Sequence, residues 1–356
     1  MFRKNTVFIL MLLIATVLAG CQGETTETSQ ENDKLSIYTT VYPLQYFTER
    51  IGGDLVSVNS IYPNGADEHS FEPSQKDMID LADSDLFFYI GLGLEGFVSK
   101  AEEALKNENV TLVATAEHIT FEEHAEDEHA LEESTEEHAE DEHAHEESTE
   151  EHAEDEHAHE ESTEEHAEDE HAHEEEDGHN HGDVDPHVWL DPIYSISLAE
   201  EIKEQLLEKL PNNKEQIEEN FSALEKELQQ LNEDFTEVTS TAKHKEFLVS
   251  HAAFGYWSER YGLEQISVSG LASTNEPTQK ELETIIAEAE EHDLHYIFFE
   301  QNVSSKLTEI VQKEIGAEPL TLHNLSTLTD ADVKDERTYF TIMKDNLEAL
   351  QTALNK

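Results

Sequence analysis

The strongest constraint on the fold is a long stretch without glycine or proline, from Asn213 to Thr239. Apolar residues recur in it at spacings of three or four, the pattern of one face of an α-helix. They are Ile217, Phe221, Leu224, Leu228, Leu231, Phe235 and Val238. At 1.5 Å per residue such a helix is about 40 Å long, which is enough to connect two domains.

Expected strands and helices alternate on both sides of this helix. Before it, strands are expected at 35–42, 54–61, 85–90 and 111–114, with helices at 44–52, 74–82, 97–107 and 193–210. After it, strands are expected at 246–250, 265–268 and 296–300, with helices at 253–261, 279–291, 305–315 and 339–354. Alternation of this kind indicates a parallel sheet. We therefore predict two parallel-sheet α/β lobes, 34–211 and 241–356, joined by one long rigid helix at 212–240. A ligand site is expected in the cleft between the lobes.

Residues 118–182 interrupt the first lobe with a different composition. This insert holds 30 acidic residues, 14 histidines and no lysine or arginine. The unit EESTEEHAEDEHAH occurs at 132–145, 146–159 and 160–173, and it contains no residue that could form a core. We therefore expect the insert to be disordered without a ligand. The whole chain has a formal net charge of −62, which excludes a nucleic-acid binder.

The histidines of the insert suggest a metal-binding role. Histidine-rich tracts bind Zn²⁺, Ni²⁺ or Cu²⁺, although a solvated linker is the simpler interpretation of a charged repeat. We predict a low-affinity zinc-collecting loop, placed before His187 so that captured metal stays near the main site. Its metal-binding histidines would be His138, His143, His145, His152, His157, His159, His166, His171, His173, His179 and His181.

The N-terminus reads as an export signal. Arg3 and Lys4 precede an apolar run of residues 7–17, which is too short to span a bilayer as a helix. The run ends in Leu-Ala-Gly-Cys at 18–21, which resembles the lipobox of bacterial lipoproteins. We expect residues 1–20 to be a signal peptide, Cys21 to be lipidated and 21–33 to be a tether. The mature protein would then lie at the cell membrane, lipid-anchored on its extracytoplasmic face.

Four candidate metal ligands lie outside the insert. His69 follows an expected strand, His251 directly follows another, and Glu300 ends a third. His187 lies in an aromatic turn between two prolines. Their positions and spacing alone leave two interpretations open, buried core histidines or a metal site.

The residues around these positions resemble a known family. The motifs are DEHSFEP at 67–73, DPHVWLDP at 185–192 and SHAAFGYW at 250–257. They resemble the metal-binding solute receptors of bacterial ABC importers for zinc and manganese, in particular the zinc-receptor branch called ZnuA or AdcA. The resemblance runs from Leu35 to the C-terminus, apart from the insert. It implies that His69, His187 and His251 are imidazole ligands and that Glu300 supplies the fourth ligand.

The implied ligand set favours zinc as the transported ion. Zn²⁺ accepts three imidazoles and a carboxylate as a tetrahedron, whereas Mn²⁺ prefers more oxygen donors. We expect Asp67, Asp185 and Asp191 to orient imidazoles or to be structural. Glu68 has the same expected role and is also an alternative ligand.

The resemblance implies a receptor, expected to be a monomer, that hands zinc to an ABC permease with its cytoplasmic ATPase. The chain has no His-Glu-x-x-His motif, and four protein ligands would close the coordination sphere, so no enzyme is expected. The alternatives are a manganese receptor and a metal-buffering surface adhesin.

Overall fold

The computed structural model describes residues 34–121, 184–272, 275–301 and 305–356. The predicted signal peptide, Cys21, the tether and the histidine repeats lie outside the described residues. The parts 34–119 and 184–356 belong to one compact unit. Within the described residues, no helix has both the length and the apolar character needed to cross a membrane.

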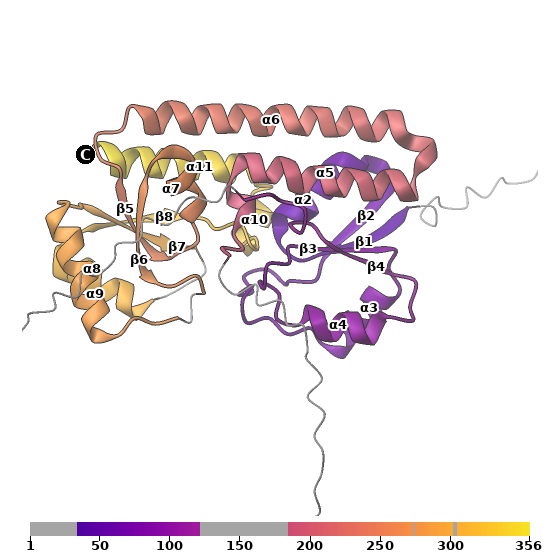
Figure 1. Cartoon of the computed structure of the whole chain (residues 1–356), viewed down its shortest axis with the longest axis horizontal. Coiled ribbons are helices and arrows are strands. Elements are labelled where there is room, and N and C mark those ends of the chain that lie inside the picture. Colours follow the sequence, from indigo (N-terminus) through magenta and orange to yellow (C-terminus); the bar gives the residue numbers. More distant parts are fainter. Residues whose placement is uncertain (1–33, 122–183, 273–274, 302–304) are drawn as a thin grey trace, which may run out of the picture. The chain divides into compact units, whose positions relative to one another are not determined.

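The first sheet has four parallel strands in the order β2-β1-β3-β4. Helices α2 and α5 lie on one side of it, and α3 and α4 lie on the other (Figure 1). The strands are β1 (Leu35–Thr39), β2 (Val56–Ser60), β3 (Leu86–Tyr89) and β4 (Thr111–Ala114). The helices are α2 (Tyr42–Gly52), α3 (Gln75–Ala82), α4 (Val98–Leu105) and α5 (Pro192–Lys209), with short 3₁₀ turns at η2 (Gly53–Leu55), η3 (Val188–Leu190) and η4 (Pro211–Asn213).

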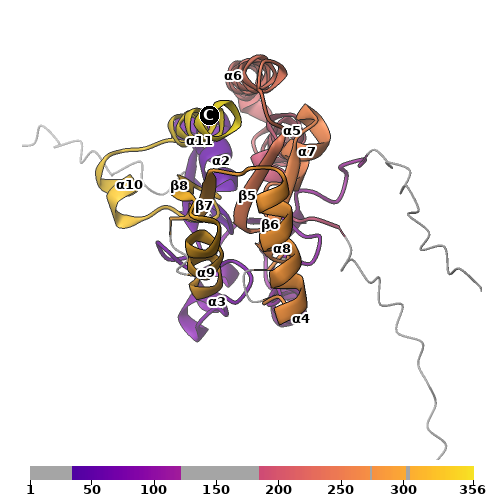
Figure 2. The same cartoon turned by 90° about the vertical axis from the view of Figure 1, so that its left-hand side faces the viewer.

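The second sheet repeats this strand order as β6-β5-β7-β8, again parallel. Helices α8 and α9 cover one face, and α7 and α11 lie on the other side (Figure 2). Leu248, Ile297 and Val311 belong to the buried core between this sheet and α8 and α9. The strands are β5 (Glu246–His251), β6 (Glu264–Ser269), β7 (Tyr296–Glu300) and β8 (Glu318–Leu322). The helices are α7 (Gly255–Tyr261), α8 (Gln279–Glu291), α9 (Lys306–Ile315), α10 (Asp330–Lys334) and α11 (Tyr339–Asn355).

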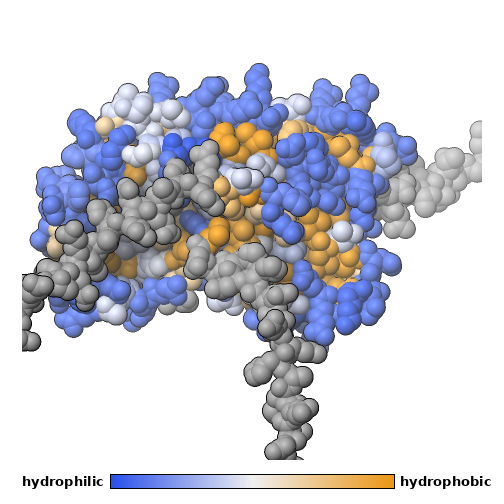
Figure 3. All heavy atoms as spheres, in the orientation of Figure 1, coloured by the Kyte–Doolittle hydropathy of each residue, from blue (hydrophilic) through white to orange (hydrophobic). Residues whose placement is uncertain are grey.

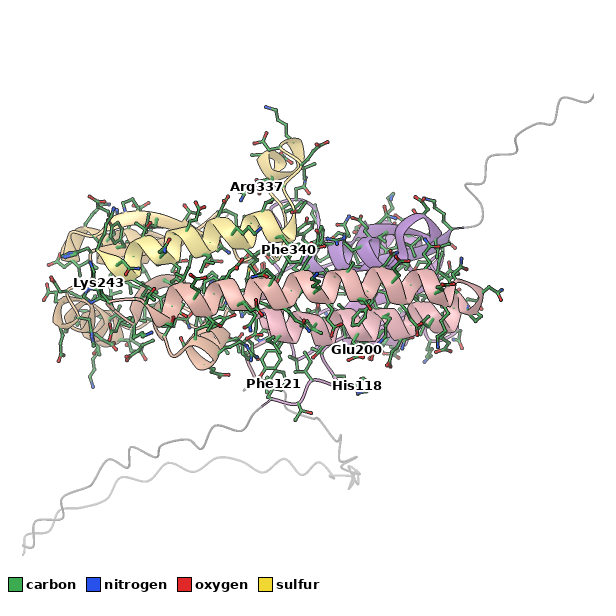
Figure 4. The ribbon with its side chains drawn as sticks, turned by 90° about the horizontal axis from the view of Figure 1, so that it is seen from above. His118, Phe121, Glu200, Lys243, Arg337 and Phe340 are labelled. Carbon is green, nitrogen blue, oxygen red and sulfur yellow. The ribbon has the colours of Figure 1, made fainter. Side chains whose placement is uncertain are left out.

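Helix α6 (Lys214–Ser240) links the two sheets. It packs against α2 and α5 beside the first sheet and against α7 and α11 beside the second (Figure 4). The predicted apolar face is buried along its length, with Thr239 rather than Val238 as its last buried residue. The Phe235 ring lies 5.1 Å from the Trp257 ring of α7, and Asn220 donates a hydrogen bond to the Ile51 carbonyl of α2. The predicted fold class, two parallel-sheet α/β lobes joined by a long helix, is confirmed.

Two elements of the second lobe were not predicted. Strand β8 contains Pro319, which argues against a central strand, but β8 lies at the sheet edge, where a missing N–H is tolerated. Helix α10 has five residues and is held by a capping box between Thr329 and Asp332. It is too short to show an apolar period.

Polar side chains dominate the outside of the described residues. Hydrophilic residues line the periphery of the face in Figure 3, and hydrophobic residues gather toward its middle. The large apolar side chains that are clearly exposed are Ile79, Ile310 and Val333. The remaining large apolar side chains of the described residues are buried or partly buried, mainly in the layers around the two sheets.

Candidate metal centre

Four side chains from three distant parts of the sequence meet in one cluster. Glu68, His69, His187 and His251 each offer one ligand atom, and these four atoms lie within 4.8 Å of one another. Among the described residues this is the one such group of three or more metal-ligating side chains. It includes the three histidines that the sequence predicted as ligands.

The chain turn that carries Glu68 and His69 follows β2. The Asp67 carboxylate accepts hydrogen bonds from the backbone N–H groups of His69 (2.9 Å) and Ser70 (3.1 Å). This is an Asx-type turn, in which a short acidic side chain replaces a backbone partner. The Tyr62 hydroxyl donates to the Glu68 carbonyl at 3.3 Å. Asp67 therefore fixes the turn through backbone contacts.

His187 is fully buried and is oriented by a carboxylate. Its Nδ1 lies 2.7 Å from Asp185 Oδ1, which also accepts the backbone N–H of His187 at 2.9 Å. A proton on Nδ1 leaves Nε2 with a free lone pair, which is the form of imidazole that binds a metal.

Asp191 fixes the chain after His187 without contacting its ring. Its carboxylate caps α5 by accepting the N–H groups of Ile193 (2.7 Å) and Tyr194 (3.0 Å), and it forms an ion pair with Arg260. Burial raises the pKa of Asp191, and the hydrogen bond and charge of Arg260 oppose that rise.

His251 ends β5 and Glu300 ends β7, the two central strands of the second sheet. This is the topological switch point, where ligands of such folds bind. His251 Nδ1 pairs with Glu300 Oε1, and His251 Nε2 lies 3.5 Å from His187 Nε2. Burial lowers the pKa of His251, but the hydrogen bond and charge of Glu300 outweigh it, so that the pKa is raised overall.

The two carboxylates nearest the imidazoles have different contacts. Glu68 offers an oxygen to the cluster itself, whereas Glu300 contacts the Nδ1 side of His251 and also accepts a hydrogen bond from Ser250 Oγ at 2.8 Å. Both are 5% exposed. Glu300 is the predicted fourth ligand, and Glu68, the predicted alternative, is the carboxylate that the structure groups with the three histidines.

One ring nitrogen of His69 lacks a hydrogen-bond partner. Its Nε2 is buried and has no hydrogen-bond partner within the described residues, and the Glu68 carboxylate lies 4.0 Å away. Burial, followed by the charges of His187 and His251, lowers the pKa of His69 to about 4. A neutral imidazole with a buried, unpartnered nitrogen fits a divalent cation, because a buried polar atom without a partner is costly.

Asn324 connects the two carboxylates, and sequence reasoning missed it. Its side-chain Nδ2 donates to Glu68 Oε1 at 3.1 Å and to Glu300 Oε2 at 2.8 Å. Its backbone carbonyl accepts a hydrogen bond from Trp189 Nε1 at 2.7 Å. Asn324 lies in the loop after β8, which itself was not predicted. No motif or spacing marked it.

The switch point of the first sheet is closed by a buried acid, which was also missed. Glu95 accepts hydrogen bonds from Thr40 Oγ1 (2.8 Å) and from the N–H groups of Ile90 (2.9 Å) and Gly91 (3.0 Å). Thr40 follows β1 and Ile90 follows β3, so Glu95 joins the ends of the two central strands. Burial raises the pKa of Glu95 to about 7, and these hydrogen bonds oppose the rise.

Comparison with known proteins gives a matching family and several similar zinc-binding proteins. Residues 37–353 match the family described as zinc-uptake complex component A, periplasmic (ZnuA). The zinc-binding protein AdcA of Streptococcus pyogenes is 32% identical over 348 residues, covering 98% of this chain but 61% of that protein. The chain thus spans about three fifths of that relative.

A second relative matches over its full length. The high-affinity zinc uptake system protein ZnuA of Bacillus subtilis is 31% identical over 356 residues, with 99% of both chains covered. Among solved structures, the Zn(II)-bound ZnuA-like domain of Streptococcus pneumoniae AdcA is similar with a TM-score of 0.66 and 29% identity. That match covers 91% of this chain and all of that domain.

Proposed function

The chain belongs to the family of zinc-uptake component A proteins (ZnuA), and from this premise we propose that it is a receptor that binds one zinc ion tightly and delivers it for import. The observation that carries the proposal is the cluster of three imidazoles and a carboxylate within 4.8 Å, in which a buried nitrogen of His69 has no hydrogen-bond partner among the described residues.

The ligand chemistry supports zinc over manganese. The proposed ligands His69, His187 and His251 supply three nitrogens, and one carboxylate completes a tetrahedral set. Mn²⁺ prefers six donors, mostly oxygens, and lies at the weak end of the divalent series. Two buried carboxylates, Glu68 and Glu300, lie beside the imidazoles, and a divalent cation can balance their charge.

The fourth ligand is one of two acids. Glu300 is the ligand that the family resemblance implied, and Glu68 is the carboxylate grouped with the histidines. Glu68→Gln and Glu300→Gln keep the size of each side chain and remove its charge. We expect the variant that loses the ligand to bind zinc more than about 100-fold more weakly. The other variant should lose about 10- to 100-fold in zinc affinity, as is typical for the loss of a group that orients a ligand. Zinc affinities measured with a competing chelator separate the two.

The proposed cellular role adds three parts to this site. Cys21 would carry a lipid that holds the receptor on the extracytoplasmic face of the membrane, and residues 118–182 would collect zinc weakly. An ABC permease with its cytoplasmic ATPase would accept the ion. No reaction is catalysed, because a receptor must hold the metal without exposing an activated water.

Calorimetric titration with zinc and manganese tests the proposal. We expect one tight zinc site in the full chain and in a chain that lacks 122–181, with the deletion losing a weaker, multi-site phase. His251→Ala should abolish the tight site. His323→Gln is a matched control, because His323 is also buried but contacts Asp332 at 3.2 Å, outside the cluster. Tight binding that disappears with 122–181, or that survives His251→Ala, would overturn the proposal.

The metal-buffering adhesin predicts a different titration. Its binding would be weak and distributed over many sites, and His251→Ala would scarcely change it. A manganese receptor would bind manganese tightly when manganese is added alone, whereas the proposed zinc receptor should bind it only weakly.

A further inference from the structure

We propose that Asn324 is a positioning residue that holds the two carboxylates of the metal centre and thereby sets the preference for zinc over manganese. This inference rests on the proposed function, and it concerns a residue that is not itself a metal ligand. Its basis is the pair of hydrogen bonds from one amide nitrogen to Glu68 and Glu300.

The orientation of the Asn324 amide is fixed by its neighbours. Its Oδ1 accepts three hydrogen bonds, from Gln301 Nε2 (3.1 Å), Ser326 N (3.1 Å) and Ser326 Oγ (3.0 Å). An amide turned the other way would place its NH₂ group against these donors. Both Nδ2 hydrogens are therefore directed to the acids, one to each carboxylate.

The backbone of Asn324 is held equally firmly. Its N–H donates to Gln301 Oε1 at 3.3 Å, and its carbonyl accepts from Trp189 Nε1. The residue is only 4% exposed. The amide is thus a rigid, buried donor rather than a side chain that happens to lie nearby.

The two acids reach this amide from different parts of the fold. Glu68 lies in the turn after β2 of the first sheet, and Glu300 ends β7 of the second. Asn324 ties one oxygen of each. A carboxylate held by one oxygen cannot rotate to place both oxygens on a cation without breaking that hydrogen bond. The number of oxygen donors open to the ion is therefore kept low, which suits four-coordinate Zn²⁺ and disfavours Mn²⁺.

The amide also holds the acids without neutralising them. Within the described residues, no lysine or arginine forms a salt bridge with Glu68 or Glu300; the basic side chains beside them are the imidazoles of His69, at 4.0 Å from Glu68, and of His251, which pairs with Glu300. A lysine or arginine in place of Asn324 would satisfy the carboxylates by charge. A neutral donor leaves their charge available to the incoming ion.

The test compares zinc and manganese affinities of Asn324→Ala with those of the wild type and of Asn346→Ala. Asn346 is a matched control, because it is also a buried asparagine but its side chain bonds to the backbone of His323 and to Met343 Sδ rather than to either acid. Affinities are measured by competition with a chromogenic chelator, with zinc and manganese each added alone. Thermal unfolding confirms that each variant is folded.

We expect Asn324→Ala to weaken zinc binding by about 10- to 100-fold and to weaken manganese binding less, so that the zinc-to-manganese affinity ratio falls by at least about tenfold. Asn346→Ala should leave the ratio unchanged. Asn324→Asp serves where the alanine variant does not fold, since it keeps the acceptor oxygen and replaces the donor by another oxygen. It should lower the ratio in the same direction.

Equal losses for both metals, an unchanged ratio, or the same change in Asn346→Ala would refute the role of Asn324. These outcomes differ from a failure of the proposed function itself. In that case the wild-type protein would show no tight zinc site, and the inference would fall with it.

Discussion

The substitution Glu95→Gln is expected to make the stability of the folded protein less sensitive to rising pH. Glu95 is buried, with 6% of its surface exposed, at the ends of β1 and β3, and this burial raises its pKa from 4.5 to about 7. The folded protein therefore keeps this proton up to about pH 7, while the unfolded chain releases it above about pH 4.5. Raising the pH through this window favours the unfolded chain. Glutamine has no proton to release, so the variant lacks this contribution.

The magnitude follows from the size of the shift. About 2.5 pKa units at 1.36 kcal/mol per unit correspond to about 3 kcal/mol, fully present as a stabilising term below pH 4.5 and lost once the pH exceeds about 7. Between about pH 5 and about pH 8 the wild type should lose about 2 kcal/mol more than Glu95→Gln, because part of the loss lies below pH 5.

Urea unfolding at a series of pH values measures this difference. Trp189 and Trp257 are fully buried, so their fluorescence reports unfolding. A chelator keeps both proteins free of metal, and the titrations of the metal-centre histidines cancel in the comparison. Glu103→Gln, on the exposed face of α4, is the control and should follow the wild type. If the difference in free energy of unfolding between wild type and Glu95→Gln stays constant with pH, burial does not raise the pKa of Glu95.

Two further substitutions test the supports of the site and of the fold. Asp185→Asn should weaken zinc binding by about 10- to 100-fold, because Asp185 orients the His187 ring. The stability of the metal-free protein should be nearly unchanged. Competition with a chelator measures the zinc affinity, and an unchanged affinity would exclude this orienting role. Gly52→Ala should destabilise the protein by about 1–3 kcal/mol, because the added Cβ would lie 2.5 Å from a methyl group of the stiff Val56 side chain. Urea unfolding measures this loss, and equal stability would show that β2 moves aside without cost.

Much of the fold could be predicted because the local signals agreed. The gap-free apolar face of α6 predicted a long helix, and Ser74 was predicted as the start of α3, where it forms a capping box with Asp77. The edge strand β8 was missed because it contains Pro319, and proline is rare in central strands. Only the completed sheet shows that β8 lies at an edge.

The site was predictable only in part. Predicted strand ends singled out His69 and His251, and the family motifs singled out these two and His187. Asn324 could not, because its partner Glu68 lies 256 positions away and the contact exists only once both lobes have folded. The turn-forming contacts of Asp67 and the helix-capping contacts of Asp191 likewise depend on backbone geometry that spacing does not reveal.

The histidines of the cluster are not equally sheltered. The side chain of His69 is 12% exposed, whereas those of His187 and His251 are 0% and 3% exposed. In the proposed receptor we therefore expect an ion that approaches from solvent to meet His69 first and a departing ion to leave His69 last. We expect this one imidazole to govern how fast the ion is captured, while the sheltered pair governs how long it stays.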